Sequence, residues 1–316
     1  MKILANDGIS KAGQVALEAK GFEVITAHVA QEQLENYINE NGIEVLLVRS
    51  ATKVRQPLID ATNLKIIGRG GVGMDNIDVD YARGKGIQVI NTPASSSQSV
   101  GEFVIAHLFS IVRNLHQANR NMPLEGDSNF NGLKKAYAKA TELRGKTMGV
   151  IGFGRIGVEV IREAIGLGMN ILVYDKFPAT REIELEFFDG QKVTFTITSV
   201  DFDEVITKAD FITLHVPAQD GYILGEKEFT KMKDGVIVIN TARGGVVDER
   251  ALVDAIEAGK VSGAALDVFE NEPAPEMGLL MNEELSLSPH IAGSTNEAQD
   301  RIGTELAAQI VEIYGV

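Results

Sequence analysis

The stretch TMGVIGFGRIGVEVIREAIGLGMNILVYD, residues 147–175, contains the pattern that decides the fold. An apolar run leads into Gly152, Gly154 and Gly157, and a helical pattern then leads to a second apolar run that ends in Asp175. In a strand–turn–helix unit the first glycine permits a tight turn, the second lets a diphosphate approach the backbone, and the third allows close helix packing. The N–H groups and dipole at the helix start favour an anion. We therefore predict a dinucleotide site.

The acidic residue of this pattern indicates which dinucleotide binds. Asp175 lies 18 residues after Gly157, where a carboxylate accepts hydrogen bonds from the adenosine ribose hydroxyls. Its charge would repel a 2′-phosphate. The sequence therefore favours NAD over NADP, although Lys176 lies next to it.

Apolar strands and helical patterns alternate on both sides of this stretch, which is typical of α/β folds with doubly wound parallel sheets. At 316 residues the chain is long enough for two domains. We expect a flavodoxin-like substrate-binding domain from residues 1–95 and 293–316, and an inserted Rossmann NAD-binding domain from 96–292. The helical pattern at 295–316 would return to the first domain, so that two crossings form a hinge beside a cleft.

Two segments depart from the alternation. Residues 99–122 have apolar residues at helical spacing for longer than their neighbours, which predicts one long helix that ends before Pro123. Residues 182–198 alternate apolar and polar side chains around Asp189-Gly190, which predicts a hairpin with a two-residue turn. A surface flap and an oligomer contact both remain open for this insertion.

Composition excludes several classes of function. The chain has no cysteine, which excludes thiol nucleophiles and thiolate metal sites, and we expect no metal. A formal charge of -14 argues against nucleic-acid binding. Neither a long apolar run nor a basic-then-apolar leader is present, so we expect no membrane contact and a cytoplasmic protein. A small anionic substrate would need a local cluster of cations.

Three candidate catalytic residues follow predicted strands of the second domain, namely Arg243, Glu272 and His290. Oxidation of an alcohol needs a base for the hydroxyl proton, and an imidazole suits that task near neutral pH. A neighbouring carboxylate would stabilise the imidazolium and fix the ring. A guanidinium could hold a substrate carboxylate through two parallel hydrogen bonds. Of the five histidines, His107 and His116 are interpreted as packing or surface residues.

The chain resembles the NAD-dependent D-2-hydroxyacid dehydrogenases over almost its whole length. The matching segments are VRSATKV, GRGGVGMDNID, NTP, GKTMGVIGFGRIG, NTARGGVVDE, GAALDVFENEP and SPHIAGSTNEAQ. The resemblance assigns carboxylate binding to Arg243, acid/base catalysis to His290 and pairing with that histidine to Glu272. It implies that further residues line NAD, with Asp267 at the nicotinamide carboxamide: Gly152, Gly154, Arg155, Ile156, Gly157, Asp175, His215, Val216, Pro217, Thr241, Ala242, Asp267 and Gly293.

Within the family the chain is most similar to the members that oxidise D-3-phosphoglycerate to 3-phosphohydroxypyruvate in serine synthesis. A second anion site in the first domain supports this. A pair of arginines there, separate from Arg243, has little purpose unless the substrate is anionic at both ends. Lys53 lies near this site, which we expect to contain Arg49, Ser50, Arg69, Gly70 and Gly71. The chain ends at Val316 without the small regulatory domain of some relatives, so we expect no serine feedback by that route.

Other functions remain open at this stage. The leading alternative is another D-2-hydroxyacid dehydrogenase, such as a glyoxylate or hydroxypyruvate reductase, and a third is an NAD-responsive binding protein. The resemblance also implies a homodimer through the long helix and its following loop. Lys134 and Lys135 resemble a basic patch that some relatives donate across that interface, but the longer loop here leaves this role undecided.

Overall fold

The computed structural model describes all 316 residues, and the chain divides into two compact units. The first unit contains Met1–Ser99 and Gly293–Val316, and the second contains Val100–Ala292. The first boundary falls inside helix α5 (Ser97–Val112), slightly later than the 95/96 boundary expected from the sequence. None of the helices has both the length and the apolar character needed to cross a membrane.

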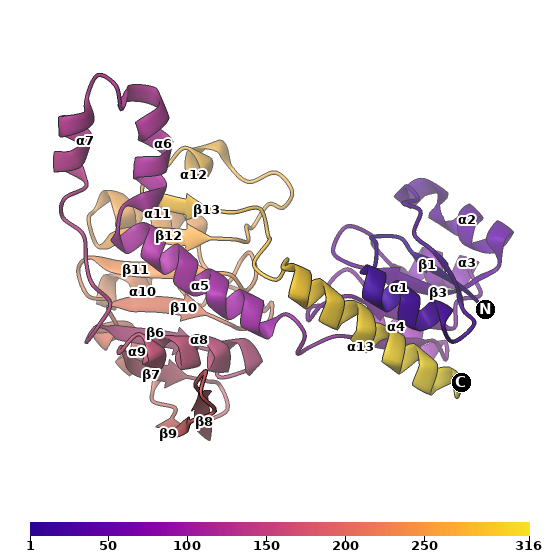
Figure 1. The fold of residues 1–316 in the computed structure, drawn as a ribbon. Helices are drawn as coiled ribbons and strands as arrows, with labels where there is room; N and C mark the ends of the chain where they lie inside the picture. The colour runs from indigo at the N-terminus through magenta and orange to yellow at the C-terminus, as the bar shows by residue number, and fades with distance from the viewer. The chain divides into compact units, whose positions relative to one another are not determined.

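The first unit is built on a five-stranded parallel sheet in the order β2-β1-β3-β4-β5 (Figure 1). This is the flavodoxin-like order, in which the order of the strands reverses between β1 and β3. The strands are β1 (Lys2–Ala5), β2 (Glu23–Ile25), β3 (Ile43–Val48), β4 (Ile66–Arg69) and β5 (Gln88–Asn91). Because β3 and β4 pair with Val48 opposite Arg69, the residues that follow both strands meet at one edge of the sheet.

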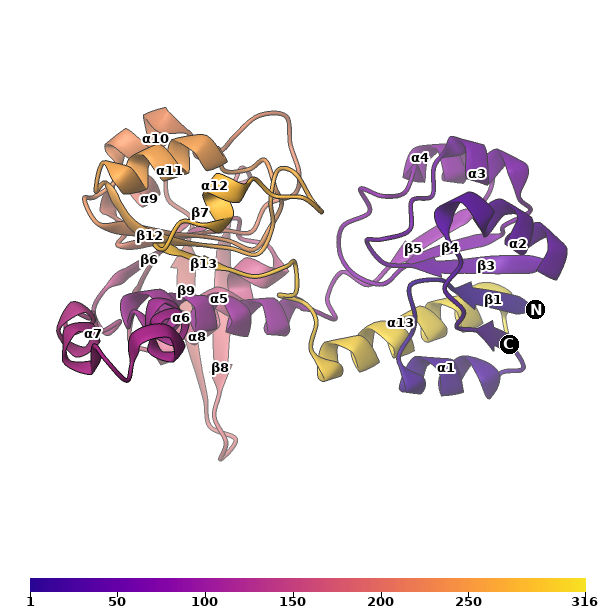
Figure 2. The same cartoon turned by 90° about the horizontal axis from the view of Figure 1, so that it is seen from above.

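Helices cover both faces of this sheet, as Figure 2 shows. One face carries α2 (Leu34–Asn41), α3 (Gln56–Ala61) and α4 (Val79–Gly84), and a short 3-10 turn, Gln31–Gln33, precedes α2. The other face carries α1 (Lys11–Glu18) and the C-terminal α13 (Asn296–Tyr314). A Cβ atom on Gly13 would lie 2.6 Å from the backbone of Gly303, so only glycine permits the close crossing of these two helices.

The second unit is built on a six-stranded parallel sheet in the order β13-β12-β11-β10-β6-β7. Its strands are β6 (Thr147–Ile151), β7 (Asn170–Tyr174), β10 (Phe211–Leu214), β11 (Val236–Asn240), β12 (Val261–Leu266) and β13 (Leu285–Leu287). The strand order reverses between β6 and β10. In sheets of this kind the ligand lies at the carboxyl ends of the strands next to the reversal.

Helices also cover both faces of the second sheet, and each face has its own apolar core (Figure 2). One face carries α5 and α8 (Arg155–Gly166). The other carries α9 (Phe202–Lys208), α10 (Glu226–Lys231) and α11 (Glu249–Glu257), while α12 (Met277–Leu280) precedes β13.

The single long helix predicted for residues 99–122 is wrong. Helix α5 ends at Val112, and α6 (Leu115–Glu125) begins after Asn114, which adopts the left-handed conformation at φ 52°. Asparagine tolerates this conformation better than most residues, and the apolar spacing continues across the break, so periodicity alone does not reveal it. The proline expected to end the helix, Pro123, lies inside α6. Helix α7 (Phe130–Ala136) then packs beside α6.

The predicted hairpin is present as β8 (Thr180–Glu186) and β9 (Lys192–Thr198), and Figure 1 shows it beside α8. Its turn has three residues rather than two, because the Phe187 N–H donates to the Gln191 carbonyl and Gly190 adopts φ 82°. In β8, Ile183 and Leu185 are buried in the core on the α8 side of the second unit. The hairpin is therefore more than a surface flap, since one of its strands completes that core.

Candidate active site

The glycine turn after β6 has the geometry that a dinucleotide site needs. Gly152 adopts φ 108°, and a Cβ atom there would lie 2.3 Å from the His215 carbonyl oxygen. A Cβ atom on Gly157 would lie 2.1 Å from the Gly152 carbonyl oxygen, so α8 packs tightly on the turn. Nothing lies within 4 Å of the position a Cβ would take on Gly154. Gly152 and Gly157 are thus tightly packed, whereas the space beside Gly154 is open to a ligand.

The start of α8 and the end of β7 complete this edge of the site. Helix α8 begins at Arg155, which is exposed, with Ile156 partly buried behind it. Asp175 follows β7 and accepts hydrogen bonds from the backbone N–H of Phe153 at 2.7 Å and of Phe177 at 2.9 Å. These bonds hold the Asp175 carboxylate against the glycine turn, where the sequence places the ribose.

Residues at the carboxyl ends of β10 and β11 lie beside the same turn. The His215 N–H donates to the Ile151 carbonyl at 2.7 Å, and the partly buried Val216 and the exposed Pro217 follow. Burial lowers the pKa of His215 to about 3, so its ring is neutral at physiological pH. Two buried polar atoms here have no partner within the protein: His215 Nδ1, and Oγ1 of Thr241, which precedes Ala242.

These observations fit NAD. The open position at Gly154 and the helix start would receive the diphosphate, and the orphaned atoms of His215 and Thr241 lie at strand ends next to the reversal in strand order. Gly293, also predicted as a cofactor residue, is the first residue of the returning segment in the other unit.

Glu272 and His290 are brought together as a hydrogen-bonded pair. His290 Nδ1 lies 2.9 Å from Glu272 Oε2, and Glu272 Oε1 accepts the Phe269 N–H at 3.0 Å. The backbone of His290 adopts φ 55°, a conformation that is uncommon for a residue other than glycine. The pairing occupies Nδ1 and leaves Nε2 as the ring nitrogen that can exchange a proton with a substrate.

A hollow of about 390 Å³ lies beside this pair and is mostly apolar. The lining residues are Phe269, Glu272, Pro273, Pro275, Leu280, Leu287, Ser288, Pro289 and His290. Apolar walls with a few polar groups are typical of small-molecule sites.

Arg243 lies in the turn after β11, and Asn240 shapes that turn. Asn240 donates from its side chain to the Arg243 carbonyl at 2.9 Å and accepts the Ala242 N–H at 3.0 Å. The Arg243 guanidinium is partly buried and donates to the Ala242 carbonyl at 2.6 Å. Asn240 was not predicted as a site residue, although an asparagine at the end of an apolar strand is a turn signal.

Asp267, predicted to meet the nicotinamide carboxamide, is fully buried. Its carboxylate accepts the Ser288 hydroxyl at 2.6 Å and the backbone N–H groups of Ile291 and Ala292, each at 2.9 Å. The structure therefore gives Asp267 a role in holding the segment that follows His290, and its place at the carboxamide stays a prediction.

The predicted substrate cations are neighbours at one sheet edge of the first unit. Arg49 follows β3 and Arg69 ends β4, and a Cβ atom on Gly70 would lie 3.7 Å from Arg49 Cγ. A Cβ atom on Gly71 would lie 1.8 Å from Arg69 Nη1, so only glycine leaves room for this end of the guanidinium. The adjacent Ser50 is exposed.

Asp7, which was not predicted as a site residue, fixes the segment that carries Arg49. Its carboxylate accepts the Arg49 N–H at 2.7 Å, the Thr52 N–H at 3.1 Å and the Thr52 hydroxyl at 2.7 Å. Burial lowers the pKa of Arg49, and the negative charge of Asp7 acts in the opposite direction. An arginine pKa is so high that the side chain stays protonated, so it remains an anion-binding group.

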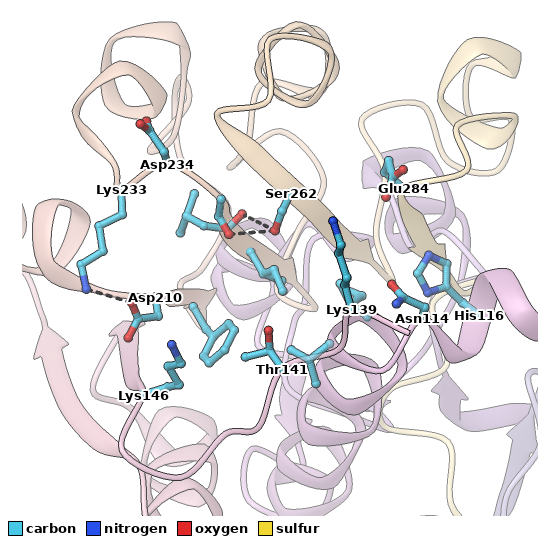
Figure 3. A pocket seen from close by; sticks show the side chains of 16 residues that line it. Asn114, His116, Lys139, Thr141, Lys146, Asp210, Lys233, Asp234, Ser262 and Glu284 are labelled. Carbon is cyan, nitrogen blue, oxygen red and sulfur yellow. Dashed lines mark hydrogen bonds and ion pairs between the residues drawn. The ribbon is translucent and has the colours of Figure 1, made fainter. Parts of the chain in front are cut away.

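A second hollow, of about 330 Å³, lies at the amino ends of the strands in the second unit (Figure 3). Lys139, Lys146 and Lys233 line it, and Lys233 pairs with Asp210 at 2.8 Å. Chemistry in open parallel sheets occurs at the carboxyl ends of the strands. The glycine turn follows the carboxyl end of β6, so this hollow lies at the opposite edge of the sheet from that turn.

Comparisons with known proteins agree with this geometry. The profile of the family described as D-isomer specific 2-hydroxyacid dehydrogenase, NAD binding domain, matches residues 105–292. The chain is 41% identical to a hydroxypyruvate reductase of Thermotoga maritima, covering 100% of this chain and 99% of that protein. It is 42% identical to a D-3-phosphoglycerate dehydrogenase of Archaeoglobus fulgidus, covering 99% of this chain and 57% of that protein.

Solved structures give the same result. The TT0316 protein of Thermus thermophilus superimposes with a TM-score of 0.84 at 25% identity, covering 100% of this chain and 97% of that one. A glyoxylate reductase of Paecilomyes thermophila superimposes with a TM-score of 0.80 at 29% identity, covering 98% of this chain and 93% of that one. The NAD-type glycine turn, the Glu272–His290 pair and these likenesses together show that the chain belongs to the NAD-dependent D-2-hydroxyacid dehydrogenases.

Proposed function

We propose that this dehydrogenase interconverts D-3-phosphoglycerate and 3-phosphohydroxypyruvate, which is the first step of serine synthesis. The observation that supports this substrate is the pair of guanidinium groups, Arg49 and Arg69, at adjoining strand ends of the first unit. A simple hydroxy acid needs one cation for its carboxylate, and Arg243 supplies it. A phosphorylated acid has a second anionic end, which two neighbouring arginines would bind well.

The residues divide the chemistry among them. In the oxidation, His290 Nε2 takes the proton of the C2 hydroxyl, and the carboxylate of Glu272 stabilises the resulting imidazolium. Arg243 binds the substrate carboxylate and orients the C2 atom, while Arg49 and Arg69 bind the phosphate. The glycine turn and Asp175 would hold NAD, which would supply the acceptor for the hydride of C2, so that the alcohol loses a hydride and a proton and becomes a ketone.

A second candidate is the reduction of hydroxypyruvate or glyoxylate. It is favoured by the hydroxypyruvate reductase of Thermotoga maritima, which matches this chain over nearly its full length. For that substrate Arg49 and Arg69 would have no phosphate to bind. The two candidates therefore differ in what removal of these arginines does.

Steady-state kinetics of NADH oxidation by the purified protein separates the candidates. We expect kcat/KM for 3-phosphohydroxypyruvate to exceed that for hydroxypyruvate and glyoxylate by about 100-fold, since two charge-assisted bonds contribute about 3 kcal/mol. Arg49→Gln should reduce the value for the phosphorylated substrate alone. Arg55→Gln, which removes a surface arginine paired with Asp78 in the same unit, is the matched control.

Each alternative has its own outcome in this experiment. Faster reduction of hydroxypyruvate or glyoxylate, with no effect of Arg49→Gln, assigns the chain to the second candidate. Binding of NADH without turnover of any of the three acids would support an NAD-responsive binding protein instead.

We also propose that the chain forms a homodimer through α6 and α7. The exposed fractions of Leu115, Leu124 and Phe130 on these helices are 60%, 77% and 57%. Burial of these apolar side chains against a second copy would be favourable, because the hydrophobic effect drives protein association. Light scattering should give twice the mass of the chain for the wild type and the mass of one chain for Leu124→Glu. A monomeric wild type would contradict the proposal.

A further inference from the structure

A network of buried and partly buried hydrogen bonds connects α5 with the segment that carries His290. His107 Nδ1 lies 2.9 Å from Ser286 Oγ, and His107 Nε2 lies 3.1 Å from Ser288 Oγ. Ser288 Oγ in turn donates to Asp267 Oδ1 at 2.6 Å. All of these residues belong to the second unit, so the chain of bonds lies within one compact body.

The chemistry of the groups fixes the direction of every proton in this chain. A carboxylate can only accept hydrogen bonds, so the Ser288 hydroxyl donates its one hydrogen bond to Asp267. Ser288 Oγ must then accept from His107, which requires a proton on Nε2. Burial lowers the pKa of His107, so the ring is neutral and Nδ1 accepts the hydroxyl proton of Ser286. If the direction of one of these hydrogen bonds were reversed, another polar group in the network would lose its partner.

Asp267 transmits this arrangement to the backbone after His290. Its two carboxylate oxygens accept the N–H groups of Ile291 and Ala292. Those bonds hold the segment in which His290 adopts φ 55°, a conformation that persists only where the surroundings enforce it. Glu272 Oε2 lies 2.9 Å from His290 Nδ1 and fixes the imidazole ring.

Because most residues of this network are buried, the loss of any one hydrogen bond is costly in free energy. The exposed fractions of His107, Ser286 and Asp267 are 7%, 6% and 0%. Phe103 packs edge-on against the His107 ring, with centroids 4.7 Å apart, and so restricts its rotation. A buried polar group that loses its partner is destabilised by about 1–3 kcal/mol, enough to make Asp267 or Ser288 reorient.

We propose that His107 is a positioning residue for His290. Through Ser288 and Asp267 it holds the backbone of the His290 segment, so that the imidazole presents Nε2 to the substrate while Glu272 engages Nδ1. This inference rests on the proposed acid/base role of His290. It adds a buried residue from a helix that is remote from His290 in the sequence.

The test compares side chains that keep different halves of the chain of bonds. His107→Gln keeps a donor at the position of Nε2, whereas His107→Asn places its amide near the position of Nδ1 and loses the bond to Ser288. We expect kcat to fall up to about 100-fold in His107→Asn and His107→Leu, because a displacement of about 1 Å at a reacting group costs about that much. We expect KM for the keto acid to change less than about threefold, and His107→Gln to restore most of the rate.

Ser288→Ala provides a second route if a His107 variant does not fold. It cuts the connection between His107 and Asp267, and it should lower kcat as His107→Asn does, whereas Ser288→Thr keeps the hydroxyl and should restore the rate. Circular-dichroism melting shows which variants are folded. A readout independent of turnover is the NMR spectrum of the His290 imidazole nitrogens, which should shift in His107→Asn and match the wild type in His107→Gln.

The outcomes separate this inference from the proposed function. If folded His107→Asn and Ser288→Ala have wild-type kcat and unchanged His290 nitrogen shifts, the positioning role is wrong, while a dead His290→Ala leaves the proposed function intact. If His290→Ala turns over like the wild type, the acid/base role itself fails, whatever the NMR spectra show. An equal loss in His107→Gln and His107→Asn would also overturn the inference, because it would show only that the ring fills space.

Discussion

His290 Nδ1 lies 2.9 Å from Glu272 Oε2, and this contact joins two residues that are 18 positions apart in the sequence. Glu272 is itself held by the Phe269 N–H, so the carboxylate is positioned before the imidazole becomes charged. The proposed acid/base residue therefore has a carboxylate partner within the same unit.

Replacing Glu272 with glutamine tests the value of this charge. Glu272→Gln retains a hydrogen-bonding group but removes the negative charge that stabilises the imidazolium. Hydrogen bonds to charged groups are worth about 1.5–3 kcal/mol, so we expect kcat to fall about 10- to 100-fold. Glu270→Gln, two positions earlier on the surface, is the matched control and should keep the wild-type rate in the same NADH absorbance assay. Equal rates for both variants would remove Glu272 from the mechanism.

Asp175 sets the preference for NAD in this account. Asp175→Ser removes the carboxylate that is bonded to the glycine turn and that would repel a 2′-phosphate. We expect the Kd of NADH to rise about tenfold and the ratio of NADPH to NADH affinity to increase, measured by fluorescence titration. Asp189→Ser at the hairpin tip should change neither value. A ratio that stays at the wild-type level would show that another residue selects the cofactor.

Glu163 on α8 makes stability depend on pH. Burial raises the pKa of Glu163 from 4.5 to about 7, and the negative charges of Glu102 and Glu159 add to this. At a pH between these two pKa values the unfolded chain releases the proton, while the folded chain keeps it. The free energy of unfolding therefore falls as pH rises through this window and stays lower above it. Glu163→Gln should therefore be more stable than the wild type at about pH 8 and equal to it at about pH 4.

The expected gain follows from the size of the shift. The full shift corresponds to about 3 kcal/mol, and solvent access to this partly exposed group reduces the expected gain to about 1–2 kcal/mol. Urea unfolding at the two pH values measures it, with Glu257→Gln on the exposed face of α11 as the control. A Glu163→Gln variant that gains nothing at the higher pH would show that the carboxyl is ionised without cost.

The β8–β9 hairpin should contribute to stability through the buried side chains of β8 and not through its tip. Ile183→Ala and Leu185→Ala remove side chains that are 1% and 8% exposed, and each should cost about 2–5 kcal/mol of unfolding free energy. Phe188→Ala at the fully exposed tip should change it by less than about 0.5 kcal/mol. Chemical denaturation of the three variants would contradict this if the two buried positions behaved like Phe188.

The parts of the fold with local signals could be predicted from the sequence. The three glycines specify the turn after β6 because each removes a Cβ atom that would collide or block a ligand, and the strands are marked by short apolar runs. The break at Asn114 was not predictable, because the apolar spacing is continuous across it. The hairpin turn was predicted one residue too short, since Asp189-Gly190 suits two-residue and three-residue turns alike.

The same distinction holds at the site. Arg243, Glu272 and His290 follow strands, and a parallel sheet gathers residues at its carboxyl edge, so they could be proposed as site residues from the sequence. The structure brings Glu272 and His290 into contact, and the catalytic roles of all three stay predictions. Asp7 and His107 gave no such signal. Their roles depend on the partners Thr52 and Ser288, which lie 45 and 181 positions away, and only tertiary packing brings these together.

The most direct test of the central claim is the turnover of His290→Ala compared with the wild type, followed by NADH absorbance with 3-phosphohydroxypyruvate, hydroxypyruvate and glyoxylate. If His290 is the acid/base group, kcat falls about 10²- to 10⁴-fold on whichever acid the wild type reduces, while NADH binds with unchanged affinity. A His290→Ala variant that reduces that acid at the wild-type rate would contradict the account.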